Sequence, residues 1–219
     1  MPAGTRVIYQ EGHREVTFML ANTNKYPVIV QSWVDNGEGD PESNQAPFVV
    51  LPAVFRLSAG DRQGLRIIYN QDPLPQDRES VFWLNLYEIP PLTDKQYQNS
   101  RLTLAMNTQL KLFWRPKGIS INLKEAVNQL DFRLLRGSDG WSVECNNPTP
   151  LNISFTSIAV LNNAHEKTTN SHIDMMTRAF SKRNYSLAGF NPASNDLKIR
   201  FRYLNEDGTS IEKIVLIDK

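Results

Sequence analysis

The fold class is decided by a short run, VIVQSWV at residues 28–34, which is followed by the turn-forming sequence Asp35-Asn36-Gly37. Its side chains are mostly β-branched or aromatic, as is typical of strands. Runs of the same kind recur at residues 16–20, 48–51, 65–69, 81–86 and 102–114, and turn formers and prolines separate them. Because the pattern has a period of two rather than 3.6, it predicts an all-β fold.

The pattern restarts after Arg115-Pro116-Lys117-Gly118, with runs at residues 130–135, 141–145, 151–161, 198–203 and 211–217. GSDG at residues 137–140 has the composition of a hairpin turn, and residues 123–130 favour a helical turn. Two successive sets of short strands predict two β-sandwiches that meet near residues 115–119.

The composition excludes several classes of protein. Of the 219 residues, 40% are hydrophobic and 21% are charged, which is enough apolar material for a packed core and excludes wholesale disorder. Lys and Arg (24) balance Asp and Glu (23) to a formal net charge of +1. The total charge therefore gives no general attraction to nucleic acid or anionic lipid. The sequence also contains no apolar run long enough to predict a membrane-spanning helix.

The start of the sequence and its cysteine bear on the compartment. Met-Pro-Ala-Gly-Thr-Arg lacks the basic-then-apolar pattern of a secretory segment, so we expect either a cytosolic protein or a mature form with an added initiator Met. Cys145 stands alone, which excludes an internal disulfide and a cysteine-based zinc site. Its place in an apolar run predicts a buried small hydrophobe rather than a nucleophile.

Candidate catalytic residues are few. His165 and His172 flank a polar stretch that we expect to be a loop, and neither they nor His13 have the spacing of a standard metal site. The sequence contains no glycine-rich phosphate loop, no Gly-x-Ser-x-Gly and no His-Glu-x-x-His. We expect neither enzymatic activity nor a cofactor. A hydrolase or metalloenzyme that uses His165 and His172 is a rival hypothesis, which stoichiometric zinc would support.

The most informative run is SRLTLAMNTQLKLFWR at residues 100–115. In a strand, Leu102, Leu104 and Met106 share one face, and Lys111 lies on the other. One interpretation is a half-buried strand whose apolar face belongs to the core. The other is an exposed edge strand whose apolar face packs against a partner by β-augmentation. A lysine in so apolar a segment is costly to bury alone, so Lys111 requires an anion or a cleft.

A second isolated cation, Arg6, lies in TRVIY at residues 5–9, which we predict to be the first strand. Taken alone, it is an exposed arginine of an edge strand. The pair Arg6 and Lys111 gains significance only if the first strand and the strand at residues 102–114 come together.

Four blocks resemble, in order, the PapD-like periplasmic chaperones of chaperone–usher pilus assembly: TRVIY (5–9), LPQDRESVFWLNLYEIPP (74–91), KLFWRP (111–116) and NPTP (147–150). The resemblance spans nearly the whole chain. It implies two immunoglobulin-like β-sandwich domains in a boomerang arrangement, with a binding cleft between them. Residues 1–117 would form the subunit-binding domain and residues 118–219 the second domain. A periplasmic location is implied as well, so that the missing secretory segment indicates a mature form.

The resemblance also implies a function without catalysis. Chaperones of this family bind, fold and cap pilus subunits by donor-strand complementation and deliver them to the outer-membrane usher. Arg6 and Lys111 match the cation pair that anchors the subunit's C-terminal carboxylate, which can accept charge-assisted hydrogen bonds from both. Leu102, Leu104 and Met106 match the alternating hydrophobic residues of the donor strand.

Other family features fall on further positions. Glu79, Arg115 and Glu206 match an ion network between the domains, and Asp207 is an alternative to Glu206 in the turn NEDG. Leu51–Pro52, where the family often has two prolines, is compatible with a cis peptide bond. The short segment at residues 92–101 resembles the short-loop branch of the family, which serves rod-like pili.

A generic two-domain immunoglobulin-like adhesion or receptor module is the alternative function. Such a module needs neither the pair Arg6 and Lys111 nor the apolar face of residues 102–106. An exposed donor strand also allows the free chain to associate with a second copy of itself.

Overall fold

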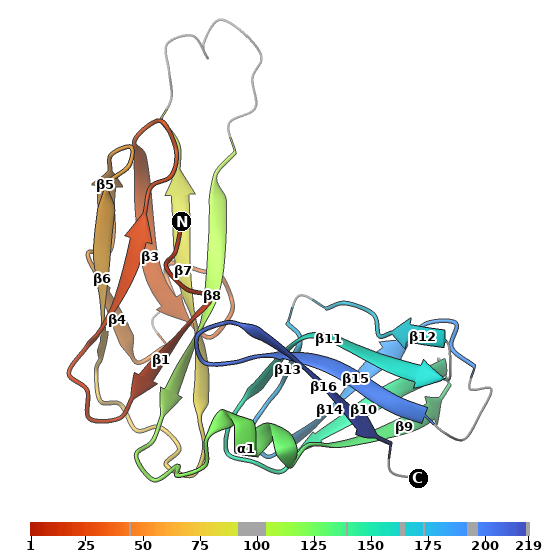
Figure 1. The fold of residues 1–219 in the computed structure, drawn as a ribbon. Helices are drawn as coiled ribbons and strands as arrows, with labels where there is room; N and C mark the ends of the chain where they lie inside the picture. Colours follow the sequence, from red (N-terminus) through yellow and green to blue (C-terminus); the bar gives the residue numbers. More distant parts are fainter. Residues whose placement is uncertain are drawn as a thin grey trace, which may run out of the picture. The chain divides into compact units, whose positions relative to one another are not determined.

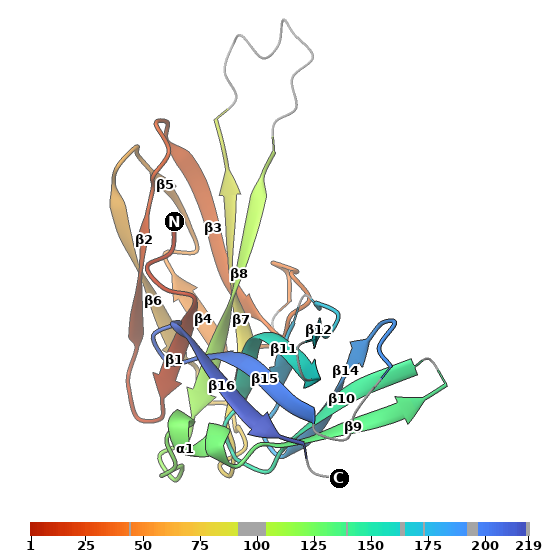
Figure 2. The same ribbon diagram turned by 45° about the vertical axis from the view of Figure 1, so that its right-hand side comes forward.

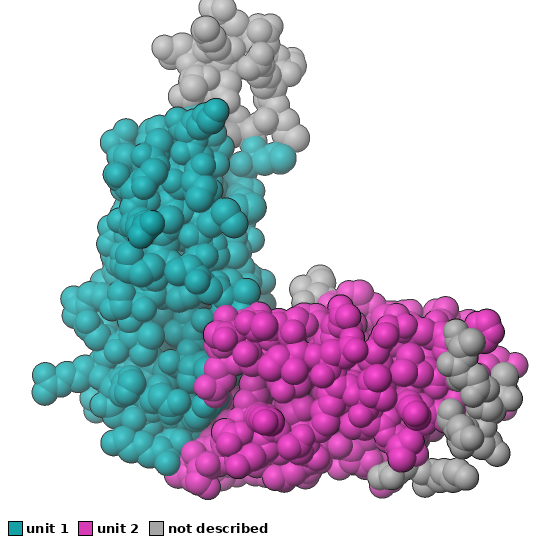
Figure 3. Space-filling model, in the orientation of Figure 1, with its two compact units in different colours: residues 1–75, 80–117 teal, residues 76–79, 118–219 magenta. Residues whose placement is uncertain are grey.

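The structure is a computed structural model that describes residues 1–43, 45–91, 104–138, 140–162, 165–172, 174–191 and 197–217. The chain forms two compact units, each described separately below and coloured in Figure 3. Unit 1 contains Met1–Pro75 and Ser80–Lys117, and unit 2 contains Gln76–Glu79 and Gly118–Lys219. Both are built from short strands, which confirms the predicted all-β class.

Unit 1 is a sandwich of two sheets (Figures 1 and 2). The larger sheet has the strand order β1-β8-β7-β3-β5, and the smaller has the order β2-β6-β4. The strands are β1 (Arg6–Gln10), β2 (Val16–Ala21), β3 (Val28–Asp35), β4 (Phe48–Leu51), β5 (Val54–Leu57), β6 (Arg62–Tyr69), β7 (Ser80–Ile89) and β8 (Met106–Arg115).

Unit 2 is a second sandwich, with one sheet in the order β14-β10-β9 and another in the order β12-β11-β15-β16, to which β13 adds through β11. Its elements are α1 (Leu123–Asn128), β9 (Asp131–Gly137), β10 (Gly140–Asn147), β11 (Ile153–Asn162), β12 (His165–Thr168), β13 (Met176–Thr177), β14 (Ser181–Leu187), β15 (Leu197–Leu204) and β16 (Ser210–Leu216). The helix α1 lies where the sequence predicts a helical turn. Asn122 and Glu125 form a reciprocal capping box at its start.

Alternation of side chains produces the core of unit 1. In β8, Leu110, Leu112 and Trp114 are buried in a cluster that also contains Leu65 and Ile67 of the opposite sheet. Every second residue of β8 therefore faces the interior, as a period of two requires. Apolar residues buried between two sheets are the main source of the stability of such a sandwich.

The N-terminal segment contacts both sheets of unit 1. Pro2 bridges to Leu20 of β2, and the backbone N–H of Ala3 donates to the carbonyl oxygen of Met19 at 2.9 Å. A few residues later, β1 pairs with β8 in the other sheet. This change of sheet places the start of β1 beside β8.

The sequence misplaces or misses several edge elements. The predicted strand at residues 102–114 is observed as β8 from Met106, and Leu102 lies outside the described residues. Four short strands, β5, β12, β13 and β14, are not predicted. The expected loop at His165 instead begins with β12, because its backbone pairs with β11. The Leu51–Pro52 peptide bond is cis. Among the described residues, no helix is long and apolar enough to cross a membrane.

Cys145 is fully buried in β10, as the sequence predicts. Burial raises the pKa of its thiol to about 12, so that at pH 8 only about one thiol in ten thousand is ionised. Because the thiolate is the nucleophile, we expect Cys145 to resist iodoacetamide in the native protein and to react readily in denaturant. Mass spectrometry of the alkylated protein measures this, and rapid labelling of the native protein would contradict it.

Candidate functional site

The structure brings Arg6 and Lys111 together. β1 and β8 are parallel neighbours, and their register pairs Arg6 with Lys111, Val7 with Leu112 and Tyr9 with Trp114. Val7 and Leu112 point into the core of unit 1, so Arg6 and Lys111 lie on the opposite face. The condition that the sequence sets for this pair is therefore met.

Both cations are partly buried at this position. The guanidinium carbon of Arg6 lies 5.6 Å from the ring centroid of Phe113, a cation–π contact that holds the side chain over the sheet. Neighbouring strands are about 4.8 Å apart, so two positive charges are held close together. An anion placed between them lowers the energy of this arrangement and can accept charge-assisted hydrogen bonds from both.

The edge of β8 beyond this pair is open. β1 pairs only with residues 111–115 of β8, and within the described residues no strand covers the same edge from Met106 to Leu110. Figure 2 shows β8 continuing past the start of β1. The backbone groups of every second residue in this stretch point to the open edge and are therefore available to a strand from a partner.

The apolar face of β8 changes from buried to exposed along the strand. Leu110 and Leu112 are buried, whereas Met106 is 58% exposed and Leu104, just before the strand, is 71% exposed. The buried part of the run, Leu110 and Leu112, thus belongs to the core, as the first interpretation expects, whereas Leu104 and Met106 do not. Leu104 and Met106 are large exposed hydrophobic residues beside an open strand edge, a combination that indicates a binding surface.

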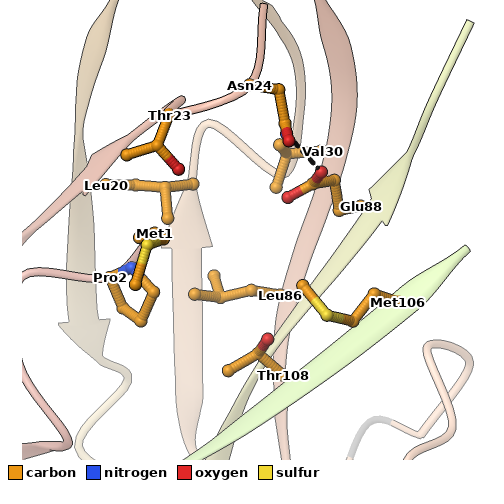
Figure 4. Close-up of a pocket in the computed structure, with 10 residues that line it drawn as sticks. All are labelled: Met1, Pro2, Leu20, Thr23, Asn24, Val30, Leu86, Glu88, Met106 and Thr108. Atoms are coloured by element: carbon orange, nitrogen blue, oxygen red, sulfur yellow. Dashed lines mark hydrogen bonds between the residues drawn. The ribbon is translucent and has the colours of Figure 1, made fainter. Parts of the chain in front are cut away.

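A cavity lies on the core side of this edge (Figure 4). Its volume is about 240 Å³, and its lining includes Leu20 of β2, Leu86 of β7, and Met106 and Thr108 of β8. At its rim, the side-chain amide of Asn24 donates to a carboxylate oxygen of Glu88 at 2.8 Å. An incoming strand at the edge of β8 would direct every second side chain toward this space.

The residues assigned to the ion network lie in both units. In unit 2, Glu79 is buried, and its carboxylate accepts a hydrogen bond from the backbone N–H of Asn152 at 2.8 Å. Arg115 ends β8 in unit 1. Glu206 is exposed in the turn after β15, where the neighbouring Asp207 accepts from the N–H of Thr209 at 2.7 Å. Asp207 is thus used within its own turn, and the network of Glu79, Arg115 and Glu206 stays a prediction.

The histidines are all exposed: His13, His165 and His172. No group of three or more His, Cys, Asp or Glu side chains that could hold a metal ion is found in the part of the chain that the structure describes. Two structural features at the site that the sequence left unassigned are Phe113 under Arg6 and the cavity beside Met106. Phe113 shares the face of Lys111, so alternation could have identified it.

These features define a class of protein: a two-sandwich binding module with an open strand edge that ends at a pair of cations. Comparison with known proteins gives the family. The chain belongs to the PapD-like pili-assembly chaperones: residues 1–120 match the family "Pili and flagellar-assembly chaperone, PapD N-terminal domain", and residues 125–214 match "Pili assembly chaperone PapD, C-terminal domain". Both matches support the immunoglobulin-like two-domain fold that the resemblance implies.

Individual relatives cover almost the whole chain. The probable fimbrial chaperone YadV of Escherichia coli K12 is 37% identical over 217 residues, which cover 96% of this chain and 86% of YadV. The crystal structure of YadV superposes with a TM-score of 0.84 and covers 99% of this chain and 98% of that one. The CupB2 chaperone of Pseudomonas aeruginosa has a TM-score of 0.84 at 31% identity, with complete coverage of both chains. The Salmonella enterica SafB chaperone, solved with the SafA pilin, has a TM-score of 0.77 at 26% identity and covers 99% and 95% of the two chains.

Proposed function

We propose that this chain caps pilus subunits by lending them the open edge of β8, with Arg6 and Lys111 as the anchor. The chain is a periplasmic fimbrial chaperone of the chaperone–usher pathway and has no enzymatic activity. Its partners are pilus subunits, and its family membership implies an interaction with the outer-membrane usher. The observation that carries the proposal is the register that places Arg6 opposite Lys111 at the end of an open edge.

The anchor determines the direction of the incoming strand. A subunit strand in line with β1 can approach Arg6 only from the open side, along residues 106–110 of β8. If its C-terminal carboxylate lies at Arg6 and Lys111, the strand runs parallel to β8, in the same direction as β1. Parallel neighbours form an evenly spaced hydrogen-bond ladder, so the anchored end sets the register of every residue before it.

The apolar face then supplies the missing strand. Leu104 and Met106 are large exposed apolar side chains at the start of the donor strand, and Leu102, the third residue expected on this face, lies outside the described residues. In a subunit that lacks its last strand, these side chains would fill the exposed groove between its sheets. Burial of each large apolar side chain stabilises the complex by about 1.5–3 kcal/mol. We assign subunit binding to residues 1–117 and the second domain to residues 118–219.

Co-expression tests this function. We expect this chain, secreted to a bacterial periplasm with a pilus subunit encoded beside its gene, to co-purify with that subunit in a one-to-one complex. The matched control is the same subunit with two residues appended to its C-terminus, which moves the carboxylate away from Arg6 and Lys111. Equal recovery of both subunits in the purified complex would contradict the anchor, and recovery of neither would contradict the function.

The same edge allows the free chain to pair with a second copy of itself. Such pairing would cover the open edge of β8 at residues 106–110 and bury the exposed side chain of Leu104. Sedimentation velocity over a range of concentrations measures this. A free protein that remains monomeric at every concentration would contradict self-association.

The subfamily is also part of the proposal. The short segment between Pro91 and Leu102 supports the short-loop branch of the family, which serves rod-like pili. Electron microscopy of the fibres assembled with the chain's own usher and subunits would test this assignment, and thin or capsule-like fibres would contradict it.

A further inference from the structure

Three side-chain amides form a cluster on the outer face of unit 1, beside the open edge. Asn85 of β7 is 0% exposed, and its side-chain oxygen accepts from the amide nitrogen of Gln109 at 2.9 Å and from that of Asn107 at 3.3 Å. The amide nitrogen of Asn85 donates to the carbonyl oxygen of Trp83 at 3.3 Å. Asn107 and Gln109 are themselves exposed, so this carboxamide cluster is buried at its base and open at its surface.

A loop after β3 borders the same cluster. The buried carboxylate of Asp35 accepts from the backbone N–H of Gly37 and from that of Gly39, both at 2.8 Å. This brings Gly39 so close to Gln109 that a β-carbon on Gly39 would lie 3.4 Å from the amide nitrogen of Gln109. Gln109 is therefore held between Asn85 and the loop, which restricts its orientation.

The position of the cluster relative to the edge follows from the register. Asn107, Gln109 and Lys111 share one face of β8, and Lys111 lies opposite Arg6. The placement of a subunit strand along this edge rests on the proposed function. Such a strand, in line with β1, must stop short of Arg6, which lies opposite Lys111. Its carboxylate then fills the position beside Leu110, next to both cations. The last residue of the subunit then lies beside Gln109, and the third residue from its end lies beside Asn107.

We propose that the carboxamide cluster is a specificity determinant that selects subunits with hydroxyl or amide side chains at their last and third-from-last residues. Asn107 and Gln109 each use one amide N–H on Asn85, which leaves the carbonyl oxygen and the second N–H of each for a partner. A hydroxyl or an amide can pair with both kinds of group. An aliphatic side chain would cover them without a hydrogen bond, which disfavours binding.

The recognition is thus divided between the two faces of β8. The face of Leu104 and Met106 is apolar and can fill the groove of any subunit that lacks its last strand. The face of Asn107 and Gln109 is polar and depends on the partner's side chains, since cross-strand neighbours on one face lie about 5 Å apart. Specificity then comes from rejecting strands that leave the amides without a partner.

A competition experiment tests the inference. Two versions of one captured subunit, with threonine or with the isosteric valine at the last and third-from-last residues, are co-expressed at equal levels with the wild-type chaperone. Two satisfied hydrogen bonds predict about a tenfold or larger excess of the threonine version in the purified complex, read by mass spectrometry. A second arm uses the chaperone variant Asn107→Leu/Gln109→Met, which keeps side-chain volume, Arg6 and Lys111. We expect it to capture both versions without preference.

Each outcome decides between the two proposals. Equal amounts of both versions in the wild-type complex would overturn the carboxamide inference and leave the carboxylate anchor in place. Capture of neither version would overturn the proposed function and the inference with it. A preference for threonine that persists in the double variant would overturn the carboxamide inference alone. The wild-type arm needs no chaperone variant, so it holds even if the double variant folds poorly.

Discussion

Replacement of Arg6 by alanine is expected to reduce recovery of a pilus subunit complex by at least tenfold, with the chaperone itself still folded. The guanidinium is positioned over Phe113 and opposite Lys111, at the end of the open edge. Each charge-assisted hydrogen bond to a carboxylate contributes about 1.5–3 kcal/mol, which corresponds to roughly ten- to a hundredfold in affinity. Lys111→Met should act in the same way, because it keeps the packing of the aliphatic stem and removes only the charge.

The measurement is the amount of subunit that co-purifies with each variant from a periplasmic extract, with circular dichroism as the check of folding. Arg56→Ala is a matched control, since Arg56 is an exposed arginine on β5, at the opposite side of the same sheet. It should leave recovery unchanged. Normal recovery with both Arg6→Ala and Lys111→Met would contradict the carboxylate anchor.

The second large effect is expected from a charge on the apolar face. Leu104→Glu and Met106→Glu should each abolish capping, because a carboxylate cannot enter an apolar groove without a large desolvation cost. Leu104 is 71% exposed and Met106 58% exposed in the free chain, so neither change should unfold it. The readout is again the recovered complex, together with the thermal unfolding midpoint of the free variant.

Ala105→Glu provides the control for this experiment. Ala105 lies between the two positions, is also exposed, and projects to the other face of the strand. The same charge at this position should leave most of the capture intact. A stable complex of Leu104→Glu with a subunit would contradict donor-strand pairing, and equal loss with Ala105→Glu would show that the effect is not specific to one face.

The sequence was sufficient to predict the strands that are half buried and apolar. In β3 and β8, alternation follows directly from one face packing in the core, and a local pattern can show this. β14, SKRNYSL, contains only two apolar residues, Tyr185 and Leu187, both of which are buried. β12, HEKT, contains no apolar residue. Their strand conformation comes from backbone pairing with β10 and β11, a tertiary interaction that no local pattern of side chains records.

The candidate site could be predicted only in part for the same reason. Alternation alone places Leu104 and Met106 on one face and Lys111 on the other. The approach of Arg6 to Lys111 depends on the N-terminal segment changing from β2 to β8, and only the family resemblance anticipated it. The buried oxygen of Asn85 and the cavity beside Met106 depend on the spacing between strands and sheets, which the sequence does not specify.

The place where β1 begins has a consequence for the timing of capture. β1 occupies the line of any strand that would continue past Arg6, so an internal segment of a polypeptide collides with it while a terminus does not. A subunit that is still emerging from the inner membrane has no free C-terminus to offer. The same holds for a subunit whose C-terminus is fused to another polypeptide. In the proposed complex, the chaperone therefore engages only finished polypeptides. In that complex, the start of β1 would act as a test of completed synthesis, and this test needs no nucleotide hydrolysis.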